Sequence, residues 1–164
     1  MARRSKQRPA SRPAICDVFE LTTVVAGAEL AVHVVTDLPL KTPIELEITR
    51  PSQKYIWTNL EDAFPVVPLG VGAGFEFRET IENLDQWALN KYRHWKGRWP
   101  SAIEGVPQDI LHIRVSLNAL KHQFGACNRD LTGTQIEVRR SGHWIEKTIS
   151  VVAAIPDWLP DKLP

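Results

Sequence analysis

Cysteine is scarce in this 164-residue sequence, and long hydrophobic runs are missing. The two cysteines, Cys16 and Cys127, stand far apart and outside any Cys-x-x-Cys pair, which excludes a disulfide framework and a zinc knuckle of the usual spacing. We interpret both as reduced thiols. No apolar run approaches the roughly 20 residues of a membrane-spanning helix. The basic start of the chain is followed by Ala14–Asp17, which is not the apolar segment that a signal peptide needs. We therefore expect a soluble, cytoplasmic protein without membrane contact.

Recognisable catalytic and cofactor motifs are also missing. The glycine-rich segment Leu69–Gly74 lacks the Gly-Lys-Ser/Thr ending of a phosphate loop, so we interpret it as a turn that lies close to a neighbouring strand. The closest pair of soft ligands is His122 and Cys127, which needs further partners to bind zinc or to act as a nucleophile. We expect no metal site and no cofactor. None of the histidines is spaced as a ligand pair; they are His33, His94, His112, His122 and His143.

What the sequence does contain is strand patterning. Residues Ile44–Arg50 and Leu111–Leu117 alternate apolar and polar side chains, which is typical of an antiparallel sheet with one solvated face. Six further segments are rich in β-branched and aromatic residues. They are Val18–Val25, Glu29–Thr36, Lys54–Thr58, Phe75–Arg78, Thr134–Arg140 and Trp144–Val152. Eight strands of this spacing predict a mainly β fold, an antiparallel β-sandwich.

The last two predicted strands form a hairpin around Ser141-Gly142. A two-residue turn there pairs Arg139 with Trp144 and Val138 with Ile145. It also places Glu137 opposite Glu146, and two like charges directly opposite each other are unfavourable. We therefore leave the register of this hairpin open.

One helix is expected, at Asn83–Lys96, within a helical insert near residues 80–100. Its apolar and aromatic positions recur three or four residues apart, and Gly97 ends it. Asn83 or Asp85 is the expected N-cap. We interpret the helix as a crossover between the two sheets.

Charge is unevenly distributed along the chain. Residues 1–13 carry five basic and no acidic residues, whereas residues 14–164 carry 15 basic and 19 acidic ones. We interpret residues 1–13 as a disordered basic arm, with an anionic partner as the alternative. Residues 14–155 then form the sandwich and 156–164 a C-terminal tail. The basic residues of the arm are Arg3, Arg4, Lys6, Arg8 and Arg12.

Cations and aromatic residues alternate in the last turns of the predicted helix. Packing of the aromatic rings onto a sheet explains this pattern without a ligand. Two functional interpretations remain open, namely an anchor for a protein partner and a surface on which single-stranded nucleic acid stacks its bases. The candidate partner-binding residues are Lys91, Tyr92, Arg93, Trp95, Lys96, Arg98 and Trp99.

Two segments resemble immunoglobulin-like sandwich domains of uncharacterised bacterial proteins. One is Val34–Pro39, followed by Thr42 and the alternation at Ile44–Ile48; the other is Cys127–Gly133, a polar loop ending in Leu-Thr-Gly. The resemblance implies an immunoglobulin-like sandwich, a fold that serves mostly in adhesion, spacing or recognition, and it implies no activity. We therefore expect a non-enzymatic recognition module that binds a macromolecule, with protein as the leading partner. Single-stranded nucleic acid is the alternative, and a hydrolase with an unrecognised site is the weakest one.

Overall fold

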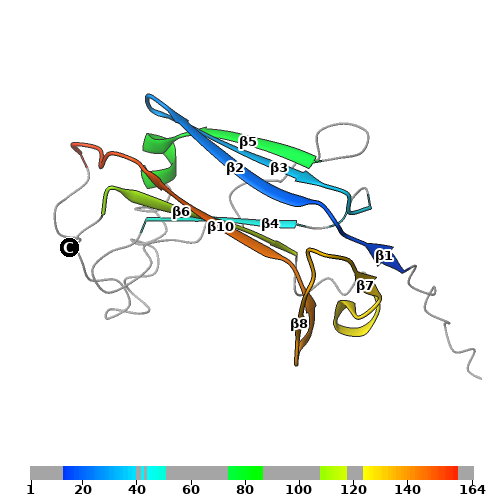
Figure 1. The fold of residues 1–164 in the computed structure, drawn as a ribbon. Coiled ribbons are helices and arrows are strands. Elements are labelled where there is room, and N and C mark those ends of the chain that lie inside the picture. The colour runs from blue at the N-terminus through cyan, green and yellow to red at the C-terminus, as the bar shows by residue number, and fades with distance from the viewer. Residues whose placement is uncertain are drawn as a thin grey trace, which may run out of the picture.

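The computed structural model describes residues 13–39, 42, 44–50, 74–86, 108–117 and 124–158. Most of these residues lie in strands, so the expected mainly β class is confirmed (Figure 1). Residues 81–86 are α-helical, and Ala126–Asn128 form the short 3-10 helix η1. The strands are β1 (Ala14–Ile15), β2 (Phe19–Ala26), β3 (Glu29–Thr36), β4 (Ile44–Thr49), β5 (Gly74–Thr80), β6 (Ile110–Leu117), β7 (Leu131–Thr132), β8 (Glu137–Arg139), β9 (Gly142–Trp144) and β10 (Glu146–Val152).

Within the described residues, the longer strands form two three-stranded antiparallel sheets. One has the order β2-β3-β5, with Thr22 opposite His33 and His33 opposite Glu76. The other has the order β10-β6-β4, with Ile113 between Ile48 and Ile149. Figure 1 shows the first sheet as the upper layer and the second as the lower layer.

The two sheets share one hydrophobic core. Alternate side chains of each strand point inward, as period-two patterning requires. Burying a large aliphatic side chain completely contributes about 1.5–3 kcal/mol, so this layer supplies most of the driving force for folding. The core residues of the longer strands are Phe19, Leu30, Val32, Val34 and Phe75 from the first sheet and Leu46, Ile48, Leu111, Ile113, Val115 and Leu117 from the second.

Smaller elements close one end of the molecule. Strand β1 pairs in parallel with β7, and β8 pairs with β9 in a separate hairpin. Gly142 opens β9 with a positive φ of 130°, and a Cβ atom there would collide with the carbonyl oxygen of Cys127. A glycine is therefore needed where the hairpin packs on η1.

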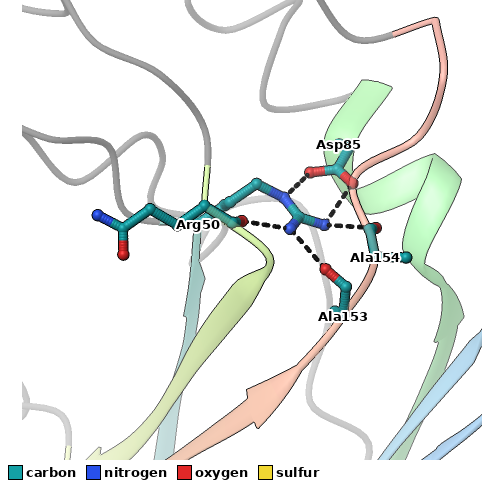
Figure 2. A network of polar contacts seen from close by, with 5 residues as sticks. Arg50, Asp85, Ala153 and Ala154 are labelled. Carbon is teal, nitrogen blue, oxygen red and sulfur yellow. Dashed lines mark hydrogen bonds and ion pairs between the residues drawn. The ribbon is translucent and has the colours of Figure 1, made fainter. Parts of the chain in front are cut away.

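A buried arginine at the end of β4 joins four segments of the chain. Arg50 is only 1% exposed, and its five N–H groups all have acceptors (Figure 2). Nε and Nη2 donate to the two carboxylate oxygens of Asp85, at 2.7 and 2.8 Å. Nη1 donates to the carbonyl oxygens of Gln108 and Ala153, and Nη2 also donates to that of Ala154. The helical residues 81–86, the approach to β6 and the segment after β10 are thereby tied to β4.

The helix begins earlier than the sequence indicates, and the expected N-cap is wrong. The Oγ1 atom of Thr80 accepts a hydrogen bond from the backbone N–H of Asn83, so Thr80 occupies the capping position. Asp85 lies inside the helix and is buried against Arg50. Leu84, one of the periodic positions, is buried as expected. The rest of the predicted helix, residues 87–96, lies outside the described residues.

Most strand predictions agree with the structure, and Glu29–Thr36 agrees at both ends. Gly74 lies close to a neighbouring strand, because a Cβ atom there would collide with the carbonyl oxygen of Val34, and the rest of the glycine-rich segment, residues 69–73, lies outside the described residues. The predicted strand Lys54–Thr58 lies outside the described residues. The prediction Thr134–Arg140 is too long, since the backbone N–H groups of Thr134 and Gln135 bind Asp17 and Cys16 instead of a strand.

The hairpin register, left open above, is set by a turn one residue earlier than Ser141-Gly142. Arg140 and Ser141 form the turn, Arg139 faces Gly142 and Glu137 faces Trp144. The chain then changes sheets at the buried Ile145, whose carbonyl oxygen accepts a hydrogen bond from Leu117. Glu146 consequently faces Ser116 of β6 and not Glu137, which removes the like-charge pair.

We predict that Arg50→Met lowers the free energy of unfolding by about 3–5 kcal/mol, because it leaves Asp85 buried without its counter-charge. Urea denaturation followed by circular dichroism measures this change. The matched control is Arg78→Met, where an arginine with solvent-exposed ion pairs should contribute much less to stability. Equal losses for the two variants would contradict the structural role of Arg50.

Candidate functional site

The outer face of β2 and β3 is the most open sheet surface among the described residues. We call it the β2–β3 face; from β2 it presents Glu20, Thr22, Val24 and Ala26, and from β3 it presents Glu29, Ala31, His33 and Val35. Val24 is 54% exposed and Val35 is 45% exposed, although both lie in regular strands. His33 and Thr22 face each other between them. The centre of this face is therefore apolar to weakly polar.

Charged side chains border the β2–β3 face along β5. The Arg78 guanidinium forms ion pairs with Glu29 across the strands, at 3.1 Å, and with Glu76 on its own strand. These hydrogen bonds raise the pKa of Arg78, Glu76 contributing most, so the side chain stays protonated. Exposed apolar side chains within a charged rim are usual in a protein-binding surface.

The outer face of the second sheet is polar and much less open. Thr49 and Ser116 on this face are buried. The Arg114 guanidinium pairs with Glu47 of β4 and, at 3.6 Å, with Glu146 of β10. These cross-strand pairs cover the middle of the face, whereas Val152 at the end of β10 is 73% exposed.

His112 and Ser150 form the one serine–histidine pair within the described part of the chain. The His112 Nδ1 and Ser150 Oγ atoms are 2.6 Å apart on neighbouring strands. A catalytic serine–histidine pair also needs a third group that orients the imidazole. In the described residues His112 has no carboxylate partner, so we interpret the contact as a cross-strand hydrogen bond.

Titratable groups gather where β1 meets the turn after β3, and they are structural. Asp37 accepts hydrogen bonds from the backbone N–H groups of Asp17 and Val18. Burial acts to raise the pKa of Asp37, but these hydrogen bonds outweigh it and the pKa is lowered. The thiol of Cys16 is fully buried beside them, and burial is the main cause that raises its pKa to about 11. Such a thiol is a poor nucleophile and metal ligand.

The β8–β9 hairpin carries basic and aromatic side chains. The Arg139 guanidinium lies over the Trp144 ring, 5.4 Å from its centroid, and pairs with Glu137 at 2.6 Å. Arg140 in the turn is exposed. The His143 Nδ1–H group donates to the carbonyl oxygen of Leu131 at 2.5 Å, which fixes the hairpin against β7.

The candidate sites taken from the sequence lie outside the described residues. This applies to the basic aromatic segment, namely Lys91, Tyr92, Arg93, Trp95, Lys96, Arg98 and Trp99, and to the arm, namely Arg3, Arg4, Lys6, Arg8 and Arg12. It also applies to His122, so its pairing with Cys127 is not described. Cys16 and Cys127 are both free.

Two kinds of feature are absent from the described residues. They contain no group of three or more histidine, cysteine or acidic side chains that could hold a metal ion. They also contain no helix with the length and hydropathy to cross a membrane.

The chain matches no family model, no curated protein and no solved structure.

The β2–β3 face escaped the sequence analysis. Its signal was nevertheless present, because Val24 and Val35 break the alternation by placing apolar residues on the polar side of their strands. Single exposed valines are common on protein surfaces. Only the register of β2 with β3 shows that these two lie on one face, on either side of the Thr22–His33 pair.

We predict that iodoacetamide at pH 8 modifies Cys127 much faster than Cys16 in the native protein. Cys16 is fully buried with a pKa of about 11, whereas Cys127 is partly exposed. Mass spectrometry of the peptides measures both reactions, and unfolding in urea should equalise the rates. Equal rates in the native protein would contradict the burial of Cys16.

We predict that Asp37→Asn destabilises the protein at pH 7 and that this effect shrinks as the pH falls below about 4. A lowered folded-state pKa means that ionised Asp37 stabilises the fold above its unfolded pKa, and that this stabilisation is lost as the pH falls through the folded pKa. Urea midpoints at pH 7 and pH 3 test this. Asp109→Asn, at another exposed carboxyl, is the control and should have little effect at either pH. A pH-independent loss in Asp37→Asn would contradict the electrostatic cause.

Proposed function

We propose that this chain is a non-enzymatic recognition module with an immunoglobulin-like sandwich fold, and that it binds a protein partner through the β2–β3 face. The observation that carries the proposal is the exposure of Val24 and Val35 on one sheet face. Burying these two side chains gives a partner an apolar contact that a purely polar sheet face does not provide.

Two features favour a protein over a small molecule. The face is part of a regular sheet, and pockets for small ligands are concave and enclose most of the ligand surface. Its border consists of fixed opposite charges, Glu29, Arg78 and Glu76, which suits a partner with a complementary polar rim.

The proposed immunoglobulin-like architecture rests on two facing antiparallel sheets and on the resemblance of Val34–Pro39 and Cys127–Gly133. The turn at Asp37 supports it as well, since Asp37 caps the N–H groups of Asp17 and Val18 and so joins β1 to the end of β3. The basic aromatic residues around Trp95 and Trp99 remain a proposed extension of the partner surface.

We predict that Val24→Asp with Val35→Asp abolishes capture of the partner protein without unfolding the domain, because both side chains are largely exposed. Affinity purification of the tagged chain from its native cells, followed by calorimetry with the purified partner, measures the loss. Two charges buried at an apolar contact should lower affinity at least about 100-fold.

Val152→Asp is the matched control, because Val152 is 73% exposed on the other sheet. It should leave binding unchanged. Trp95→Ala and Trp99→Ala test the second part of the surface in the same assay. If the double variant on the β2–β3 face binds as tightly as wild type, or if the wild-type chain binds no protein directly, the proposed function is wrong.

A further inference from the structure

Strand β5 (Gly74–Thr80) forms one edge of the first sheet within the described residues (Figure 1). It pairs with β3 on one side, and no described strand pairs with its other side. Proteins usually protect such an edge with a very short strand, a proline or a lysine, because free N–H and C=O groups can pair with another chain. Strand β5 has seven residues and contains neither proline nor lysine, so these three protections are missing.

The pairing with β3 determines which backbone groups of β5 point away from the sheet. The N–H group of Ile81, directly after β5, donates to the carbonyl oxygen of Ala28, directly before β3, at 2.8 Å. Backbone groups alternate in direction along an antiparallel ladder, so those of Phe77 also point toward β3. The N–H and C=O groups of Glu76 and Arg78 therefore point outward, where a further strand can bind them.

The side chains of Glu76 and Arg78 make this edge complementary to itself. They lie one residue before and one residue after Phe77, on the outer face of the sheet, where they face His33 and Ala31. If β5 pairs antiparallel with β5 of a second copy about a two-fold axis at Phe77, Glu76 of each copy lies opposite Arg78 of the other. Opposite charges directly across two strands are favourable, whereas like charges in the same positions are unfavourable.

Backbone groups and side chains are satisfied in the same register. With the axis at Phe77, Glu76 and Arg78 of the two copies form the hydrogen-bonded pairs, so the outward N–H and C=O groups meet in about four hydrogen bonds. The Arg78 side chain is 57% exposed, and its Nε and Nη1 atoms donate to Glu76 and Glu29 of its own chain. Its Nη2 atom has no acceptor in the described structure, so it is available to a carboxylate of the second copy.

We propose that β5 is an interaction surface for a second copy of this chain, and that two copies join their first sheets into one six-stranded sheet. The N–H group of Thr80 binds the carboxylate of Glu79 at 2.8 Å, and residue 81 begins the helix, so the contact is confined to the middle of β5. Such a short contact lies at the low end of interface sizes, and we expect a dimer with a Kd of about 10–100 µM. The two β2–β3 faces then lie on the same side of one sheet.

Sedimentation equilibrium between about 5 and 500 µM chain, a range that brackets the expected Kd, measures the association. The wild-type chain should form a reversible dimer. Glu76→Arg alone and Arg78→Glu alone place like charges opposite each other, so each should raise the Kd at least about 10-fold. A 1:1 mixture of the two variants restores opposite charges at both positions and should associate as tightly as wild type. Circular dichroism confirms that each variant is folded.

Strand β8 supplies the matched control, because Glu137 and Arg139 flank Val138 in the same order. Their side chains are 60% and 40% exposed, but β8 has only three residues. Glu137→Arg and Arg139→Glu should therefore leave the Kd of the dimer unchanged. The Val24→Asp, Val35→Asp variant should also dimerise like wild type, so this result and the test of protein binding through the β2–β3 face are independent.

Three results would overturn the proposal. The first is a wild-type chain that stays monomeric at every concentration, including the case in which the β5 variants weaken capture of a different protein, because that protein would then occupy the edge. The second is a dimer that the β8 variants weaken and the β5 variants do not. The third is a 1:1 mixture that associates no better than either β5 variant alone, which would mean that the substitutions disturb the fold and do not face each other.

Discussion

The buried guanidinium of Arg50 is the constraint on which the arrangement of the remaining segments depends. It donates to one carboxylate and to three backbone carbonyl groups, and these acceptors come from three different parts of the chain. Lysine cannot replace it, because an ammonium has three donors and no planar fork. The segment after β10 is held through Ala153 and Ala154, at a point where no strand partner is available to satisfy those carbonyl groups in the described structure.

The Arg50–Asp85 ion pair contributes more to the specificity of packing than to net stability. Burial raises the pKa of Asp85 even though Arg50 opposes the shift, which means that removing the carboxylate from water is costly. Buried ion pairs often contribute little beyond an apolar pair of the same volume, yet losing one partner is strongly unfavourable. A different packing of the helix would separate the two charges, and a different packing of the C-terminal segment would leave N–H groups of Arg50 without their carbonyl acceptors. The network therefore disfavours both alternatives.

Local sequence patterns predict most of the strands, but they do not predict the contacts between the strands. Alternation identifies Leu111–Leu117, and β-branched content identifies Glu29–Thr36; each strand buries one complete face. The same rule contained the signal for Arg50, which continues the inward positions of Ile44, Leu46 and Ile48. An arginine on the apolar side of a strand requires a buried acceptor set, and its partner Asp85 stands 35 residues later. No local rule selects that partner.

The β8–β9 hairpin and the β2–β3 face also depend on contacts that local sequence patterns do not predict. The like-charge conflict between Glu137 and Glu146 correctly indicated that the simple register was unfavourable, but the change of sheets at Ile145 depends on Leu117, a distant residue. The exposed valines Val24 and Val35 are likewise placed on one face only by the pairing of β2 with β3. The sequence therefore shows which strand positions break the alternation of apolar and polar residues. Only strand pairing shows whether two such positions lie on the same face of a sheet.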